Sequence, residues 1–198
     1  MLGMVAGLLG VGPAAAEPES RRLNKQIGLF ERAVDDMLVE SPNFLVHSQD
    51  NTRGTYLDGH GAVFTFKTSL NTWPGGFGDN HRWSWSDDDV HVVVLSESSY
   101  EVRGGKEWRE RRIKKQETLY DLGKKELIET IVDFGDLLST LDGEDWLKLE
   151  ARLRGAEFFK EKDIRRLTIQ VKMRDVRAHA DGTLDEDELA RRIETEEN

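Results

Sequence analysis

The first residues along the chain that could take part in catalysis surround a single histidine. His60 lies between two glycines and follows Asp58 by two positions. A histidine that neighbours a carboxylate can act as a general acid or base when its ring is accessible, and flanking glycines leave a ring accessible. The sequence therefore offers His60 and Asp58 as a candidate catalytic pair. The alternative is a histidine whose hydrogen bonds are satisfied in a purely structural role.

A second group of polar residues lies in residues 71–91, the least regular part of the chain. Its possible metal ligands are His81, His91, Asp87 and Asp89. Imidazole and carboxylate ligands together suit zinc and other divalent metals. However, the chain has no H-E-x-x-H or comparable signature that would fix such ligands on one face of a helix. A divalent metal is therefore the alternative, and a polar loop without any cofactor is favoured.

The same stretch contains three of the five tryptophans of the chain: Trp73, Trp83 and Trp85. Exposed aromatic rings next to aspartates could form a stacking platform for a sugar or a peptide. The alternative is that the rings fold down and cover one face of a sheet. The three tryptophans are the candidate ligand-binding residues.

Residues 181–189 resemble the second half of a calcium-binding EF-hand loop, with Gly182 at the sharp turn and Glu188 at the last ligand position. Arg177 stands where such a loop needs its first carboxylate. The sequence therefore favours two short helices, with Gly182 ending the first and Asp185 capping the second.

The signatures of common enzymes are missing from the sequence. There is no G-x-S-x-G, S-x-x-K, P-loop or G-x-G-x-x-G pattern. The chain also has no cysteine, which excludes disulfides, thiolate metal sites and a cysteine nucleophile. These absences favour a protein that is not an enzyme.

Composition limits the class of partner. The chain has 198 residues, 33% of them charged, and a formal net charge of -10. This acidity disfavours non-specific binding to nucleic acids and to anionic lipids. A basic stretch at residues 103–115 is interleaved with glutamates and reads as the solvated face of a helix, although it could also dock an acidic partner.

Residues 1–16 carry no charge and end in Ala14-Ala15-Ala16, an A-x-A cleavage pattern before Glu17. The apolar run is too short to anchor the chain across a bilayer. The pattern predicts a secretory signal cleaved after Ala16 and a periplasmic or secreted protein, although the usual positive residues at the start are missing.

Hydropathy patterns predict the elements that must position these residues. Apolar residues at three- and four-residue steps predict helices at 20–39 and 106–141, although Gly123 and Gly135 disfavour a single straight helix in the second range. Alternation predicts strands at 62–70, 146–153 and 167–173, with others at 44–48 and 90–95. Glycines 59 and 61 are expected to mark a β-bulge or a close approach by another backbone.

These elements predict an α+β fold, because the strands do not alternate regularly with helices. We expect a mainly antiparallel sheet of about five strands, packed by an N-terminal helix and a long central helix and followed by short C-terminal helices. Residues 17–198 would form a single domain with an acidic C-terminal tail.

Two segments carry a resemblance. One is Tyr56-Leu57-x-Gly59-x-Gly61-Ala62-Val63-Phe64 after an amphipathic helix, and the other is the strand, short helix, Gly182 and Leu184…Glu188-Leu189 of residues 169–193. Together they resemble exported bacterial α+β proteins of unassigned function. The resemblance implies no activity, cofactor or catalytic residue.

The sequence thus predicts an exported, non-enzymatic envelope protein that binds an unknown protein partner through one sheet edge or through the tryptophan-containing loop. The alternative is a metal- or small-ligand-binding protein, or a hydrolase, that uses the histidine, aspartate and tryptophan side chains of residues 71–91.

Overall fold

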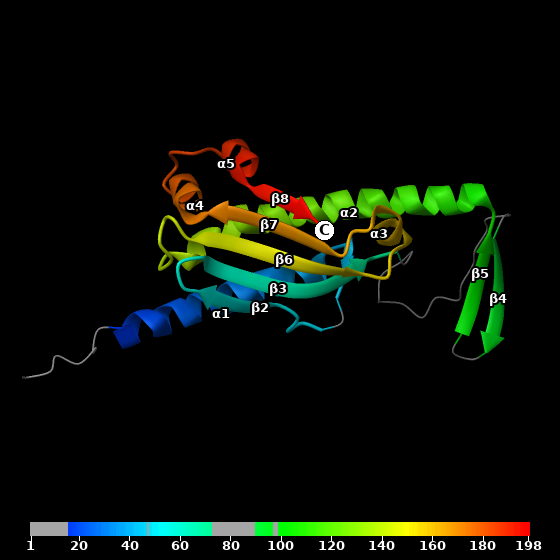
Figure 1. Cartoon of the computed structure of the whole chain (residues 1–198), viewed down its shortest axis with the longest axis horizontal. Helices are drawn as coiled ribbons and strands as arrows, with labels where there is room; N and C mark the ends of the chain where they lie inside the picture. Colours follow the sequence, from blue (N-terminus) through cyan, green and yellow to red (C-terminus); the bar gives the residue numbers. More distant parts are fainter. Residues whose placement is uncertain (1–15, 47, 73–89, 97–98) are drawn as a thin grey trace, which may run out of the picture.

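A six-stranded sheet with two long helices on one face forms the body of the molecule (Figure 1). The computed structural model describes residues 16–46, 48–72, 90–96 and 99–198, with the backbone alone at residues 16–18, 90–96 and 99–104. The helices are α1 (Ala16–Glu40), α2 (Lys106–Phe134), η1 (Gly135–Leu138), α3 (Glu157–Lys162), α4 (Met173–Ala180) and α5 (Glu186–Arg192). The strands are β1 (Phe44–Leu45), β2 (Arg53–Leu57), β3 (Gly61–Leu70), β4 (Val90–Ser96), β5 (Ser99–Gly104), β6 (Trp146–Arg154), β7 (Arg166–Lys172) and β8 (Glu194–Glu197). The predicted α+β class is confirmed.

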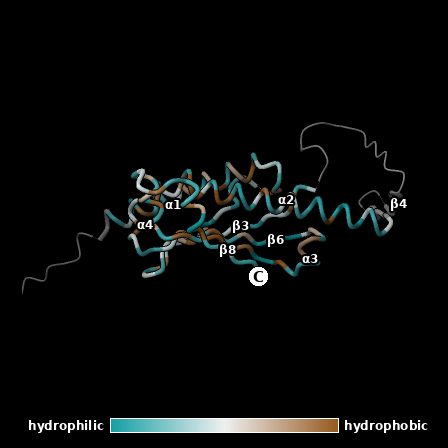
Figure 2. The backbone as a smooth tube through the Cα atoms, turned by 90° about the horizontal axis from the view of Figure 1, so that it is seen from above, coloured by the Kyte–Doolittle hydropathy of each residue, from teal (hydrophilic) through white to brown (hydrophobic). Residues whose placement is uncertain are grey.

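The order of the strands is β1-β3-β6-β7-β8, and β2 also pairs with β3. All pairs are antiparallel except the central one, β3 with β6, which is parallel. Because parallel neighbours need a long crossover, the chain between β3 and β6 contains α2, which packs on the same face as α1. The sheet is therefore mixed. The strands β4 and β5 form a separate antiparallel hairpin before α2 (Figure 1), and Figure 2 shows β4 beyond one end of α2, away from the sheet.

The hydrophobic core lies between the sheet and the two long helices. Helix α1 buries the predicted stripe, which includes Phe30, and the ring of Phe30 lies 4.6 Å from that of Phe64 in β3. Helix α2 buries Leu127 and Ile131 in the same core. Each such side chain contributes about 1.5–3 kcal/mol when fully buried. Phe134, the last residue of α2, is exposed.

Helix α1 also fixes the outer strand β2 through two carboxylates. Asp35 Oδ1 accepts hydrogen bonds from the amide and the hydroxyl of Thr52, at 2.9 and 2.6 Å. Glu31 Oε1 accepts one from the amide of Gly54 at 2.6 Å. These contacts satisfy backbone donors on the free side of β2, and so protect an edge that other strands could join.

Several local expectations were wrong. The predicted strand at residues 44–48 is only two residues long. Glycines 59 and 61 do not form a bulge: Gly59 lies in the turn of the β2–β3 hairpin, and Gly61 begins β3, where the backbone of Trp146 approaches it closely, the alternative expected for such glycines. The acidic residues Glu194–Glu197, expected as a tail, pair with β7 as the outer strand β8. By contrast, Gly182 adopts a positive φ of 71° and Asp185 caps α5, as predicted for two short helices.

Candidate interaction surface

The turn that carries His60 is held in place by the sheet. The amide of Trp146 donates to the carbonyl of His60 at 3.0 Å. Gly61 has a φ of 108°, and a Cβ atom there would lie 2.1 Å from the carbonyl oxygen of Trp146. Only glycine allows this conformation and this close approach. The glycine next to His60 is thus explained by the packing of the hairpin against β6.

The His60 ring is exposed, and it does not form a hydrogen bond with the Asp58 carboxylate. Its Nδ1 atom is 3.1 Å from the main-chain oxygen of Asp58, its one side-chain hydrogen bond within the described residues. A general base normally has its ring oriented by a second polar side chain. The geometry of the turn does not supply that orientation.

The other candidates lie mostly outside the described residues. Trp73, Trp83, Trp85, His81, Asp87 and Asp89 belong to residues 73–89, of which nothing is described. His91 lies opposite Arg103 in the β4–β5 hairpin, where the backbone alone is described. Among the described residues, no group of three histidine or acidic side chains could hold a metal ion.

The structure exposes a surface that the sequence does not reveal, the sheet face turned away from α1 and α2. We call it the open face. It comprises the odd-numbered residues of β2 and β3 and the even-numbered residues of β6, β7 and β8, which alternate with the buried ones. In Figure 1 this face is turned toward the viewer, and no helix of the described part of the chain covers its centre.

The open face is basic, although the protein as a whole is acidic. Its charged residues are Arg53, Lys67, Lys148, Arg152, Arg154, Arg166 and Lys172, against Glu150, Glu194 and Glu196. These are seven cations and three carboxylates, in a chain with a net charge of -10. Positive charge is therefore concentrated on one face of the sheet.

The charge is concentrated further in a row across three neighbouring strands. Lys67 of β3 lies directly opposite Arg152 of β6, which lies directly opposite Arg166 of β7. Neighbouring strands are only about 4.8 Å apart. We call Lys67, Arg152 and Arg166 the cationic row. Like charges that lie directly opposite one another destabilise a sheet, so folding alone does not account for this row.

A single carboxylate compensates part of the row. Glu150 Oε1 lies 3.4 Å from Arg166 Nε and 3.9 Å from Arg152 Nε. The side chain of Glu150 is 17% exposed, whereas those of Arg152 and Arg166 are 57% and 50% exposed. Within the described residues, Lys67 has no ion pair. The row therefore presents a net positive charge to solvent.

At the opposite end of the open face, Lys172 is engaged by groups of the protein itself. The ammonium of Lys172 lies 4.2 Å from the ring centroid of Trp146 and donates to the main-chain oxygen of Glu144 at 2.5 Å. The Glu144 carboxylate in turn accepts from Arg174 at 2.8 and 3.1 Å. This end has few free donors, so the cationic row is the part of the open face that is best suited to an anionic partner.

Sequence reasoning missed the row because its three residues are far apart in the chain. Each one alternates with buried residues and reads locally as a solvated position of a strand. The one available signal was the density of cations at 152, 154, 165 and 166, on either side of a short helix.

No helix in the described part of the chain is long and apolar enough to cross a membrane. A comparison with known protein families, with curated proteins and with solved structures finds no match to this chain.

Proposed function

We propose that this protein is a non-enzymatic binding module of the cell envelope that takes an acidic protein partner on the open face. The observation that carries the proposal is the cationic row, three cations placed directly opposite one another on the sheet face that no helix in the described part of the chain covers. Such a row is unfavourable in the free protein and becomes favourable once carboxylates of a partner lie over it.

The net charge of the protein does not oppose this local attraction. At physiological ionic strength the Debye length is about 8 Å, so that exposed charges farther apart than this are largely screened. A partner on the open face therefore experiences mainly the cations beneath it. A nucleic acid is a poorer candidate, because its long phosphate backbone would extend over the acidic remainder of the surface.

The proposed location rests on residues 1–16 alone, which lie outside the described part of the chain. Their uncharged composition and their A-x-A pattern support export. Cell fractionation of the full chain, followed by N-terminal sequencing, tests this part of the proposal. Export predicts a protein that begins at Glu17 in the envelope or the medium, whereas an unprocessed chain in the cytoplasm would contradict it.

Charge reversal on the row tests the binding function. The probe is a short, fluorescein-labelled, glutamate-rich peptide, and its affinity is measured by fluorescence anisotropy at increasing salt. Arg152→Glu combined with Arg166→Glu should weaken binding by about tenfold or more, because two favourable contacts become repulsive. Binding by the unchanged protein should also weaken as salt increases.

The matched control is Lys25→Glu combined with Arg32→Glu on α1. Both control residues are exposed and belong to the helix that packs on the opposite face of the sheet. The two double variants change the net charge equally, so a general electrostatic effect would weaken binding to the same extent in both. Equal losses, or no loss in either variant, would contradict a site on the open face.

A further inference from the structure

The cationic row runs across the strands of the sheet and not along any one of them. Lys67, Arg152 and Arg166 occupy directly opposite positions of β3, β6 and β7. Beyond β7 the next residue on this line is Asn198, which exchanges main-chain hydrogen bonds with Arg166 at 2.7 and 2.9 Å. On the outer side of β3, the side-chain amide of Asn51 donates to the carbonyl of Lys67 at 2.8 Å. The line therefore contains three cations and no acidic side chain.

Along a strand, by contrast, the charge changes sign. On the open face of β6, Lys148, Glu150, Arg152 and Arg154 follow one another at two-residue steps. An acidic segment that ran along β6 over Arg152 and Lys148 would also lie over the carboxylate of Glu150, and like charges repel. A segment that crosses the strands over the row meets cations only. The charge pattern therefore favours a partner that crosses the strands.

The two arginines of the row keep most of their hydrogen-bond donors free. Glu150 Oε1 approaches only the Nε atom of each, at 3.9 Å from Arg152 and 3.4 Å from Arg166. Within the part of the chain that the structure describes, no hydrogen bond engages the terminal amino groups of either side chain. A guanidinium has five N–H donors in a planar fork that matches a carboxylate. Each arginine can therefore take a carboxylate of the partner.

The spacing of the row matches a helix better than an extended segment. Neighbouring strands lie about 4.8 Å apart, so the row spans about 9.6 Å from its first strand to its third. On a helix, side chains three or four positions apart are about 5–6 Å from each other, and seven residues rise about 10.5 Å. Alternate side chains of an extended segment are about 6.7 Å apart. Three carboxylates at positions i, i+4 and i+7 of one helix therefore match the three cations.

We propose that the acidic partner presents an α-helix that lies across the strands of the open face, with carboxylates at positions i, i+4 and i+7 over Lys67, Arg152 and Arg166. This inference rests on the proposed function and deepens it, because it defines the secondary structure of the partner segment, the positions of its acidic residues and its orientation on the sheet.

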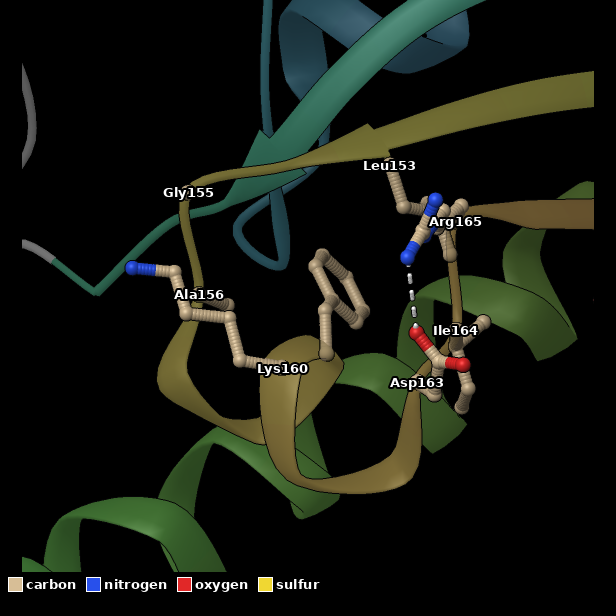
Figure 3. A pocket seen from close by; sticks show the side chains of 8 residues that line it. Leu153, Gly155, Ala156, Lys160, Asp163, Ile164 and Arg165 are labelled. Atoms are coloured by element: carbon tan, nitrogen blue, oxygen red, sulfur yellow. Dashed lines mark hydrogen bonds and ion pairs between the residues drawn. The ribbon is translucent and has the colours of Figure 1, made fainter.

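The nearby hollow under α3 takes no part in this contact (Figure 3). It has a volume of about 320 Å³ and lies in the connection from β6 to β7. Leu153 lines it, is buried, and alternates with Arg152 along β6, so the hollow belongs to the helix-covered side of the sheet. The cationic row points to the other side, and the partner helix lies on the open face alone.

Two peptide isomers test the helix without altering the protein. Both are alanine-based and fluorescein-labelled, have the same composition, and are held helical by the same hydrocarbon staple, as circular dichroism checks. One carries three glutamates at i, i+4 and i+7, and the other carries them around the helix at i, i+5 and i+6. The first should bind the full chain about threefold or more tightly in fluorescence anisotropy, because it alone places all three carboxylates over the row.

A matched pair of lysine variants tests the orientation. Lys67 lies beside Arg152 across the strands, whereas Lys148 lies four residues from Arg152 along β6. Lys67→Gln and Lys148→Gln each remove one positive charge from the open face. Lys67→Gln should weaken binding of the i, i+4, i+7 peptide by about threefold, and Lys148→Gln should leave it nearly unchanged. A helix that lies along the strands predicts the reverse.

The outcomes separate this inference from the proposed function. Equal affinities of the two isomers, or a larger loss in Lys148→Gln than in Lys67→Gln, would overturn the helix across the strands. The acidic partner would remain in place if binding still depended on Arg152 and Arg166. If neither isomer binds the unchanged protein, both proposals are overturned.

Discussion

At the scale of single residues, the cationic row should make the free protein less stable than it could be. Replacing Lys67 by threonine removes the repulsion with Arg152 and introduces a residue that favours strands. We expect Lys67→Thr to raise the free energy of unfolding by about 0.2–1 kcal/mol, measured by urea denaturation. The same variant should bind the glutamate-rich peptide more weakly.

Lys148→Thr is the control for this prediction. Lys148 also points to the open face, but its cross-strand neighbours are Val63 and Gln170, which carry no charge. Its replacement relieves no direct repulsion and should not stabilise the protein to the same extent. If Lys67→Thr has a lower free energy of unfolding than the unchanged protein, repulsion within the row does not destabilise the sheet.

The hairpin turn gives a second prediction at this scale. Gly61→Ala should destabilise the protein by about 2–5 kcal/mol, because the new Cβ would meet the Trp146 carbonyl at 2.1 Å in a backbone conformation that alanine disfavours. Gly59→Ala, at a φ of 70° with no atom within 4 Å of the new Cβ, should cost only about 1–2 kcal/mol. Similar losses in the two variants, measured by urea denaturation, would mean that the close contact with β6 is absent.

At the scale of elements, the glycine inside α2 is explained by the approach of β1. Gly123 lies in the continuous helix and leaves room for a side chain of that strand. A Cβ at Gly123 would lie 2.5 Å from the ring of Phe44, which is 2% exposed. Helix propensity favours alanine over glycine by about 1 kcal/mol, but overpacking costs about 1–3 kcal/mol. We therefore expect Gly123→Ala to lower the free energy of unfolding, and Phe44→Leu to reduce that loss in the double variant. A stabilising Gly123→Ala would contradict the contact.

The outer strand β8 should respond to acid through Glu197. Burial raises the pKa of this carboxyl, but the hydrogen bond from Lys124 Nζ at 3.0 Å and the neighbouring Tyr120 outweigh it, so the pKa lies below its ordinary value of 4.5. A lowered pKa in the folded state stabilises the protein fully above pH 4.5, and that contribution is lost as pH falls through the folded value.

Glu197→Gln tests this linkage. The variant should be less stable than the unchanged protein at neutral pH, and the difference in unfolding free energy should shrink as pH falls below about 4.5. Urea denaturation at a series of pH values measures the difference. A difference that stays constant across the series would mean that the charge of Glu197 does not hold β8 against α2.

At the scale of the whole molecule, the sequence predicted the elements whose residues repeat with a regular period. The buried stripe of α1 and the alternating faces of β3, β6 and β7 are confirmed, since one period decides which side of an element is apolar. Pairings between distant strands carry no such local signal. The parallel contact of β3 with β6 and the acidic edge strand β8 were therefore missed.

The candidate surface depends on those missed pairings. Lys67, Arg152 and Arg166 become one row only in the register that joins β3 to β6 and β6 to β7. A shift of one residue would move side chains to the other face of the sheet, so composition alone could not have revealed the row.

The most direct test of the account is to map the binding site on the unchanged protein. Amide chemical shifts of the isotope-labelled full chain are followed by NMR while the glutamate-rich peptide is added. We predict saturable changes at residues 67, 152 and 166 and at their neighbours on the open face of β3, β6 and β7, with little change in the exposed residues of α1. Changes confined to α1 or to the N-terminal half of α2, or no saturable change at all, would contradict an acidic-partner site on the open face.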